Sequence, residues 1–448
     1  MTKALLNRPI EVTPTSDVLF NSKQPAARAM LVNASTANAE GLSSLLSAIE
    51  SLNRREKLPI AGVQWLSNRL TLGRAFPWSA VLFTAKNKHT GRYRPLAPGQ
   101  SLMSDERRIG RLKGPDALLV KALSLRLSEI LDPSFSEHSY AYRQGAKNQG
   151  VALRSFYDQV FLAKKYAFVA KLDVRDFFGS IPHDRLFQTL RSQALPPLWL
   201  ELIEGFLSHS SSSGLLQGSP LSGVLSNLTL HSFDQALETA GIPFLRYADD
   251  ITLLAKTPDE LEAQIQRAQR ELESLGLSVN EGKTLRFTTL HDSNEKSKYL
   301  DRFEFLGFEF TREGTYAIRE KTLLRAKKRI QRLFSGTGQI RPHRSPGSTL
   351  KEAIHRFHLF VGSERHDDER RTKKYRLSRP SRSGLYGWVR YWTALPHSPR
   401  IDAQLQALHL EVVRTLRPFS RPLKKNLRSA VSAYRTLTAA QKNPQAGT

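Results

Sequence analysis

The chain of 448 residues contains no cysteine, which excludes disulfide bonds and thiolate metal sites. No apolar run approaches the length of a transmembrane helix, and the first residues lack a basic segment followed by the apolar core of a signal peptide. No histidine pair in the sequence suggests a zinc site. We therefore expect a cytoplasmic protein without a membrane partner, in which acidic side chains are the available metal ligands.

Acidic residues are few relative to basic ones. Lysine and arginine number 67 against 41 aspartates and glutamates, which gives a net charge of +26. A surplus of this size predicts an anionic partner, and nucleic acid is the first candidate. The length predicts about two to four domains or subdomains.

Two adjacent acids, Asp249 and Asp250, stand where the apolar runs 244–248 and 251–255 meet. The runs have the length and composition of strands, and a two-residue acidic connection is typical of a hairpin. Neighbouring carboxylates repel each other unless they share a cation, and Mg²⁺ is the obvious candidate. A solvated Asp-Asp turn is the more common alternative for the dipeptide alone, since acids are frequent turn residues.

A third acid, Asp173, closes an apolar stretch at 166–172 that has the texture of a buried strand. An acid buried there alone would be costly, so we expect a metal or another cation beside it. Asp176 and Asp184 serve as structural controls, the first as a solvated loop acid and the second as an acid in the first turn of a helix.

Several further segments have both a functional and a structural interpretation. A Gly/Ser-rich turn at 214–222 leads into an apolar helix, where backbone N–H groups could receive an anion, although such turns are common connectors. The basic turn 86–91 joins two short strands and suits phosphate contact or simple solvation equally well. Residues 257–275 form a helix with a capping box and carry no chemistry.

The C-terminal part is basic and partly helical. Residues 303–310 alternate aromatics in a strand-turn-strand pattern, and a basic amphipathic helix follows from residue 318. Trp388, Tyr391 and Trp392 interleave with basic residues, which fits either nucleic-acid contact or helix packing.

Seven motifs, in this order and spacing, resemble those of bacterial reverse transcriptases of the group-II-intron-like and phage-defence-associated types. They lie at 91–96, 139–145, 171–183, 217–222 continuing to 228, 246–250, 276–283 and 305–308. The resemblance implies an α+β right-hand polymerase whose fingers and palm carry an antiparallel sheet packed on helices, followed by a helical, basic thumb and C-terminal region. The implied parts are an N-terminal, partly helical extension (1–75), fingers and palm (76–312), the start of the thumb (313–340), a flexible basic linker or arm (341–385) and a C-terminal helical, thumb-like region (386–448).

The same resemblance implies the activity and its participants. The protein would be an RNA-directed DNA polymerase that uses two Mg²⁺ ions, with Mn²⁺ as a substitute, an RNA template, a DNA or RNA primer and dNTPs. Asp173, Asp249, Asp250 and the Val174 carbonyl would bind the ions, and Lys283 would protonate pyrophosphate. The other implied residues are Lys86, Arg94, Arg143, Phe178 and Gln217 at the nucleotide, Phe305, Leu306, Gly307 and Phe308 in the primer grip, and Arg325, Lys328, Arg329, Arg390 and Trp392 at nucleic acid.

The chain also departs from the family pattern. Gly223 stands where many relatives have a second proline, and no nuclease module rich in His and Cys follows the polymerase region. These departures favour a stand-alone or host-associated enzyme in phage defence, with a dedicated noncoding RNA as template. An intron-type RNA-binding splicing cofactor, an RNA-templated RNA polymerase and an untemplated nucleotidyl transferase stay open as alternatives, and so does the oligomeric state.

Overall fold

The computed structural model describes residues 25–56, 60–71, 76–87, 93–97, 100–103, 105–144, 147–210, 213–291, 298–334, 391–392, 394–396 and 398–416. The chain forms two compact units. The first consists of Met1–Gly145, Asp173–Gly241 and Arg267–Glu281, and the second of Ala146–Leu172, Ile242–Gln266 and Gly282–Thr448. Among the described helices, none combines the length and the apolar character needed to cross a membrane.

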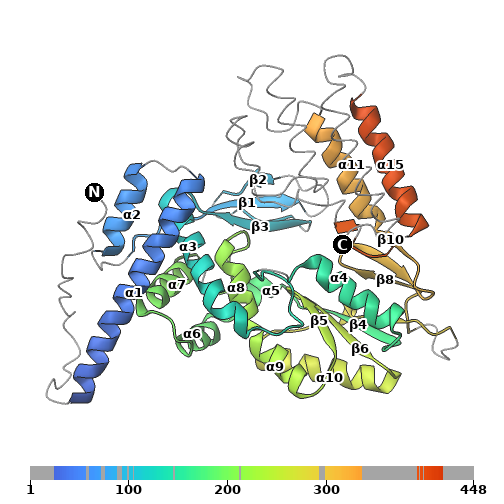
Figure 1. Cartoon of the computed structure of the whole chain (residues 1–448), viewed down its shortest axis with the longest axis horizontal. Helices are drawn as coiled ribbons and strands as arrows, with labels where there is room; N and C mark the ends of the chain where they lie inside the picture. The colour runs from blue at the N-terminus through green and yellow to red at the C-terminus, as the bar shows by residue number, and fades with distance from the viewer. Residues whose placement is uncertain are drawn as a thin grey trace, which may run out of the picture. The chain divides into compact units, whose positions relative to one another are not determined.

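Long helices make up much of the first unit. They are α1 (Pro25–Glu56), α2 (Ile60–Thr71), α3 (Gly114–Leu131) and α7 (Pro197–Ser210). Helix α1 packs against the other three (Figure 1). The indole N–H of Trp199 in α7 donates to the carbonyl of Gly41 in α1 at 2.9 Å, and Arg126 Nε in α3 donates to the Ser44 carbonyl at 3.1 Å. The N-terminal extension is thus joined to the first unit by a buried helical contact.

A small antiparallel sheet in the first unit has the strand order β2-β1-β3. Its strands are β1 (Leu82–Asn87), β2 (Tyr93–Pro95) and β3 (Glu106–Arg111). Lys86 in the middle strand lies opposite Tyr93 on one side and Arg107 on the other. Because Arg107, Arg108 and Arg111 are exposed, this sheet presents a basic surface.

Shorter helices complete the first unit. They are α5 (Phe177–Ser180), α6 (His183–Arg191), α8 (Pro220–Thr229) and α9 (His231–Thr239). Helix α8 is almost wholly buried and packs on α3. Ser219 caps its first turn by accepting a hydrogen bond from the Leu221 N–H, and Pro220 occupies the first position. The predicted Gly/Ser turn leading into an apolar helix is confirmed.

The second unit is built on a four-stranded sheet with the order β5-β6-β4-β7. Its strands are β4 (Phe168–Asp173), β5 (Phe244–Tyr247), β6 (Asp250–Ala255) and β7 (Leu285–Thr288). Helix α4 (Gln149–Tyr157) contacts β5, and α10 (Pro258–Ser274) follows β6. The Glu260 N–H donates to Thr257 Oγ1 at 3.2 Å, which confirms the predicted cap of this helix.

A second antiparallel sheet in this unit, ordered β10-β9-β8, packs on an aromatic core. Its strands are β8 (Arg302–Phe305), β9 (Phe308–Thr311) and β10 (Tyr316–Ile318). The ring of Phe156 in α4 stacks on Phe303 with centroids 5.5 Å apart and lies 4.6 Å from Phe305. Phe161 stacks on Phe310 at 5.4 Å. The strand-turn-strand predicted at 303–310 is therefore confirmed.

Two helices pack side by side beyond this sheet, α11 (Glu320–Phe334) and α15 (Pro399–Leu416) (Figure 1). Gln404 of α15 exchanges two hydrogen bonds of 2.8 Å with the backbone N–H and carbonyl of Ile318. The basic amphipathic helix predicted from residue 318 is thus present as α11. Helices together with antiparallel sheets confirm the predicted α+β class.

Candidate active site

The β5–β6 hairpin carries the two adjacent acids. Tyr247 at the end of β5 pairs with Asp250 at the start of β6, so the turn consists of Ala248 and Asp249. A turn made of Asp249 and Asp250 was predicted, and this is wrong by one position because Asp250 already belongs to the strand. Asp249 therefore lies at the tip, and Asp250 is fixed by the strand pairing.

The first residue of this turn, Ala248, is held in a strained conformation. Ala248 has φ 61°, in the left-handed region that residues with a Cβ seldom adopt. Arg246 is 1% exposed, and its Nη1 donates to the Ala248 carbonyl at 3.1 Å. Burial also raises the pKa of the Tyr247 phenol. Buried groups on β5 thus hold the backbone at the acidic tip.

Asp173 is the last residue of β4, as predicted. Strand β4 lies between β6 and β7 in the sheet. The Ala167 N–H donates to the Ala255 carbonyl at 3.1 Å, which sets the start of β4 beside the end of β6. The two strands therefore run in opposite directions, so the strand ends that bear Asp173 and Asp250 share one edge of the sheet.

Lys171 is a site residue that sequence reasoning missed. Its Nζ lies 3.1 Å from Asp250 Oδ1, and the two side chains are 19% and 38% exposed. Side chains alternate along a strand, so Lys171 shares a face of β4 with Asp173 two positions later. That spacing was the signal in the sequence that could have identified it.

The backbone after Asp173 is anchored by a second segment of the first unit. The Asn280 N–H donates to the Asp173 carbonyl and the Arg175 N–H to the Ser278 carbonyl, both at 2.8 Å. Val174, whose carbonyl is the expected metal ligand, is 3% exposed and forms a bridge with residue 279. Such pairing limits the freedom of the chain directly after the acid.

The two control acids lie where the sequence predicted. Asp176 is exposed in the loop before α5, and Asp184 is exposed in the first turn of α6. Lys283 is also exposed, at the end of the short helix Glu281–Lys283.

The Gly/Ser turn brings Gln217 and Phe178 into one part of the first unit. The Leu215 N–H donates to the Phe178 carbonyl at 2.6 Å, and the Gly110 N–H of β3 donates to the Gln217 carbonyl at 2.8 Å. A Cβ on Gly214 would lie 2.6 Å from the Phe178 carbonyl oxygen, so only glycine permits this approach. The turn therefore connects β3 to the loop that follows Asp173.

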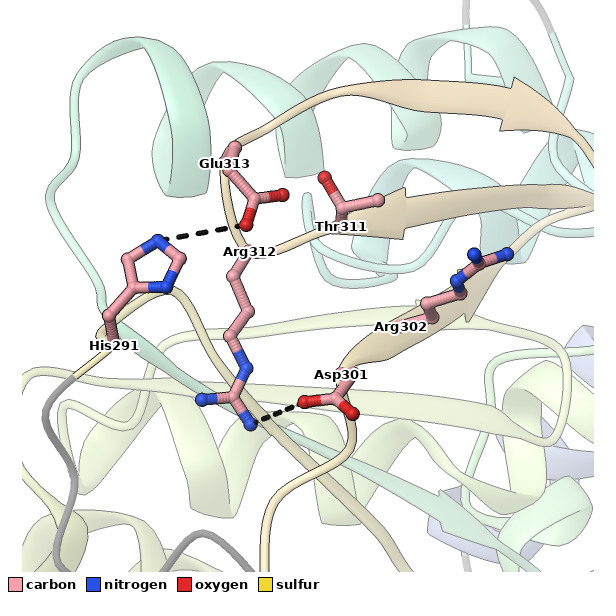
Figure 2. Close-up of a pocket in the computed structure, with 6 residues that line it drawn as sticks. All are labelled: His291, Asp301, Arg302, Thr311, Arg312 and Glu313. Carbon is pink, nitrogen blue, oxygen red and sulfur yellow. Dashed lines mark ion pairs between the residues drawn. The ribbon is translucent and has the colours of Figure 1, made fainter.

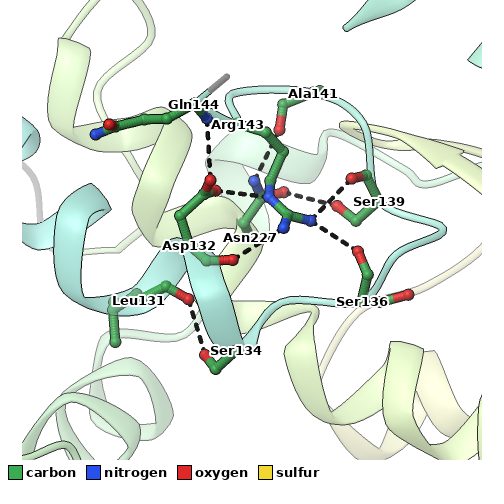
Figure 3. Close-up of polar contacts among 9 residues, drawn as sticks. All are labelled: Leu131, Asp132, Ser134, Ser136, Ser139, Ala141, Arg143, Gln144 and Asn227. Carbon is green, nitrogen blue, oxygen red and sulfur yellow. Dashed lines mark hydrogen bonds and ion pairs between the residues drawn. The ribbon is translucent and has the colours of Figure 1, made fainter. Parts of the chain in front are cut away.

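Arg143 has a different role from the predicted nucleotide contact. Its Nε lies 2.6 Å from Asp132 Oδ1, and its other nitrogens donate to the carbonyls of Asp132, Ser136 and Ser139 at 2.7–3.0 Å (Figure 3). The side chain is 5% exposed. The predicted contact of Arg143 with a triphosphate is therefore wrong. The guanidinium is buried, and its N–H groups donate to Asp132 and to backbone carbonyls of this loop.

Arg94 and Lys86 lie on the small basic sheet. Arg94 pairs with both carboxylate oxygens of Glu106, at 2.8 and 2.6 Å, and these hydrogen bonds lower the pKa of the Glu106 carboxyl. The Arg94 side chain remains 29% exposed. Lys86 Nζ lies 5.5 Å from the centre of the Tyr93 ring. The rest of the predicted basic turn, 88–91, lies outside the described residues.

The predicted primer grip forms the β8–β9 hairpin. Phe305 and Phe308 are 1% and 0% exposed, so neither ring is available to a primer. Of the predicted primer grip, only the two turn residues, Leu306 and Gly307, stay as candidates for contact with a primer. The Leu306 carbonyl accepts a hydrogen bond from the Tyr391 hydroxyl at 2.6 Å, and burial raises the pKa of that phenol. Tyr391 was expected among the C-terminal aromatics but not at this turn.

The other predicted nucleic-acid contacts divide into three groups. Arg325 and Lys328 are exposed on α11. Arg329 belongs to α11, but its side chain lies outside the described residues, as does the whole of Arg390. Trp392 is 1% exposed, which corrects its expected contact with nucleic acid. Of the two roles that the sequence left open for Trp392, burial agrees with packing.

The donor chemistry at the sheet edge suits a hard cation, since carboxylate oxygens are the preferred ligands of Mg²⁺. The three acids of this edge therefore fit the expected ions by ligand type. Within the part of the chain that the structure describes, no three acidic or histidine side chains form a cluster that could hold a metal. Asp250 is paired with Lys171 instead.

A separate surface pocket of about 390 Å³ lies in the second unit (Figure 2). It is lined by His291, Asp301, Arg302, Thr311, Arg312 and Glu313. Its charges largely pair with one another: Arg312 lies 3.0 Å from Asp301, and His291 lies 3.7 Å from Glu313. None of the predicted site residues lines it, and we assign it no role.

Comparison with known proteins gives one family and distant relatives. The chain is 29% identical over 157 residues to an uncharacterized 91 kDa protein in the cob intron of Schizosaccharomyces pombe, covering 32% of this chain and 19% of the relative. It is 25% identical over 166 residues to a retrovirus-related Pol polyprotein from a type-1 retrotransposable element R2 of Nasonia vitripennis, covering 32% and 16%. The chain thus spans less than a fifth of the length of these relatives.

Among solved structures, apo telomerase from Candida tropicalis aligns with 80% of this chain and 70% of its own length, at 12% identity and a TM-score of 0.38. The family model that matches is described as reverse transcriptase (RNA-dependent DNA polymerase), and it matches residues 88–310. This segment includes β4, the β5–β6 hairpin and the Gly/Ser turn. The family match confirms the predicted right-hand polymerase fold. Residues 88–310 therefore belong to the reverse transcriptase family.

Proposed function

We propose that the protein is an RNA-directed DNA polymerase that extends a DNA or RNA primer with dNTPs on an RNA template. The observation that carries the proposal is the acidic sheet edge, where Asp173 ends β4 and Asp250 begins the neighbouring strand β6. This edge lies within the segment that matches the reverse transcriptase family. The surplus of 26 positive charges suits a nucleic-acid partner.

Asp173 and Asp249 would hold two divalent ions, Mg²⁺ or in its place Mn²⁺, with Asp250 and the Val174 carbonyl in support. The ions would supply activation of the primer hydroxyl and stabilisation of the leaving pyrophosphate. Lys171, 3.1 Å from Asp250, would orient that carboxylate.

Residues of the first unit would receive the nucleotide. Gln217 and Phe178 are both half-buried beside the Gly/Ser turn. We assign Phe178 to the sugar and Arg94 and Lys86 to the triphosphate, and Lys283 of the second unit to protonation of pyrophosphate. In the second unit, the 306–307 turn would contact the primer, and the exposed Arg325 and Lys328 of α11 would contact the duplex backbone.

Primer extension on an RNA template, with dNTPs or with rNTPs, tests the proposal. The wild-type chain should make DNA, and the double variant Asp249→Ala with Asp250→Ala should make none. Asp184→Ala is the matched control, because Asp184 is an exposed acid in the first turn of α6. Wild-type product only from rNTPs, or an equal amount of DNA from the double variant, would contradict the proposal.

Two alternatives predict different behaviour of the wild-type chain and the double variant. An untemplated nucleotidyl transferase would add nucleotides without regard to template sequence. An RNA-binding splicing cofactor would retain its RNA affinity and its effect on splicing in the double variant.

The biological setting is a separate proposal. A dedicated noncoding RNA template, and a role in phage defence, rest on the resemblance of the motifs, whereas the relatives named above are eukaryotic. Sequencing the RNA that co-purifies with the protein tests this setting. One dominant RNA species would support it, and a broad mixture of cellular RNA would contradict it.

A further inference from the structure

Tyr142 stands out in the first unit because it is exposed and yet firmly held. Its side chain is 51% exposed, and its φ of 58° lies in the left-handed region. A bulky residue with that backbone conformation is strained, and such strain persists only where the surrounding structure imposes it.

The neighbours of Tyr142 impose this conformation from both sides. The Ala141 carbonyl accepts a hydrogen bond from Asn227 Nδ2 in α8 at 2.8 Å. Arg143 is held by Asp132 and by backbone carbonyls, and the Gln144 N–H donates to Asp132 Oδ2 at 3.0 Å (Figure 3). The backbone around Tyr142 is therefore preorganised by polar contacts on both sides.

The Tyr142 ring lies in a space that a glycine leaves open. A Cβ added to Gly223 in α8 would lie 2.7 Å from Cδ1 and 2.8 Å from Cγ of the Tyr142 ring. Real Cβ atoms do not approach so closely, and Cγ is not the movable end of the side chain. Any larger residue at position 223 would therefore displace the ring.

From this position the ring meets Phe178 edge to face. The two centroids are 6.5 Å apart, and the ring planes are at 85°. Such an arrangement is favourable because the positive edge of one ring faces the negative face of the other. The Phe178 ring also meets Phe177 at 5.3 Å, and the Phe178 carbonyl accepts from the Leu215 N–H. Phe178 is thus contacted on its ring by two aromatics and on its backbone by the Gly/Ser turn.

We propose that Tyr142 is a positioning residue for Phe178 and that it sets the discrimination between deoxyribo- and ribonucleoside triphosphates. The inference rests on the proposed polymerase function and on the assignment of Phe178 to the sugar of the nucleotide. A ring that cannot rotate or retreat excludes an extra 2′-hydroxyl more strictly than a loose one. Gly223 belongs to the same device, because its lack of a side chain lets the Tyr142 ring reach Phe178.

The test measures kcat/KM for dATP and for ATP in primer extension on an RNA template. Tyr142→Ala should lower the ratio of kcat/KM for dATP to kcat/KM for ATP by about 3- to 10-fold. This factor corresponds to the free energy of one edge-to-face ring contact. Tyr142→Phe should keep the wild-type ratio, because the contact uses the ring and not the hydroxyl. A ratio for Tyr142→Phe as low as that for Tyr142→Ala would contradict the inference.

Gly223→Ala should reproduce the loss by displacing the ring. In the Tyr142→Ala background the same change should have no further effect, because the atoms that it displaces are gone. Independent, additive effects of the two substitutions would contradict the coupling.

Trp65→Ala is the matched control. Trp65 is 44% exposed in the first unit and meets Phe76 edge to face at 6.0 Å, so its loss should leave the nucleotide ratio unchanged. Tyr142→Gly is the second variant that removes the ring. Glycine accepts the left-handed backbone without strain, which offsets part of the lost ring contact, and this variant should lower the ratio as Tyr142→Ala does. A wild-type ratio in Tyr142→Ala contradicts the inference alone, whereas absence of DNA product from the wild-type chain contradicts the proposed function.

Discussion

The hairpins β5–β6 and β8–β9 of the second unit share one construction but differ in what they present. Each joins its strands through two residues and begins the turn with a non-glycine residue in the left-handed region, Ala248 at φ 61° and Leu306 at φ 46°. The β8–β9 turn continues with Gly307 at φ 90°, which accommodates the tight connection. The β5–β6 turn continues with Asp249.

The strands beside these turns differ in the same way. Phe305 and Phe308 pair across the β8–β9 hairpin and are both buried in the aromatic core. At the β5–β6 hairpin, Tyr247 pairs with Asp250. The Asp250 side chain is 38% exposed and forms an ion pair with Lys171. One hairpin therefore contributes stability, and the other presents charge at a strained turn. Substitutions in the two hairpins should affect different measurements.

The largest effect on stability is expected in β8–β9. Phe305→Ala should lower the free energy of unfolding by about 3–5 kcal/mol, because it leaves a cavity beside Phe156. Urea denaturation followed by circular dichroism measures the change. Leu324→Ala, at a residue 49% exposed on α11, is the control and should cost less than about 0.5 kcal/mol. Equal effects of the two substitutions would contradict the structural role of this hairpin.

A smaller effect, on activity, is expected at the partner of the β5–β6 hairpin. Lys171→Met should lower kcat/KM for dNTP incorporation by about 10-fold, because Asp250 loses the cation that orients it. Lys171→Arg should recover most of the loss. Lys165→Met, at an exposed lysine before β4, should match wild type in the same steady-state assay. Full activity of Lys171→Met would contradict the proposal that Lys171 orients Asp250.

The smallest effect distinguishes the two turns by sign. Ala248→Gly should raise the free energy of unfolding by about 1 kcal/mol, because glycine accepts the left-handed backbone without strain. Leu306→Gly relieves the same kind of strain but removes a side chain that is only 8% exposed, so it should be destabilising. Chemical denaturation of both variants measures the difference. A loss of stability in Ala248→Gly would show that the turn carries no strain.

Much of this organisation could be predicted because it is local. An apolar run ending in Asp173 indicates a strand with an acid at its end, and Thr257 with Glu260 indicates a helix cap within four residues. The alternating aromatics at 303–310 predicted the β8–β9 hairpin, because this pattern is also local. Turn position was less certain, because the pairing of Tyr247 with Asp250 decides it and the dipeptide itself does not.

The misassigned residues depend on distant partners. Arg143 is buried because Asp132 and three backbone carbonyls lie around it, and Phe305 is buried because Phe156 packs on it from a helix about 150 residues earlier in the chain. Lys171 gains its role from Asp250 in another strand. Strand β3 escaped prediction because four of its six residues, 106–111, are charged and its strand structure depends on pairing with β1.

The central claim is that Asp249, at the tip of the β5–β6 turn, serves catalysis and not stability. Asp249→Asn removes one charge at nearly constant volume, and RNA-templated incorporation of dNTPs measures the consequence. We expect activity to fall by more than about 100-fold, with the unfolding midpoint and the RNA affinity unchanged. Incorporation at the wild-type rate by the folded Asp249→Asn protein would contradict this claim.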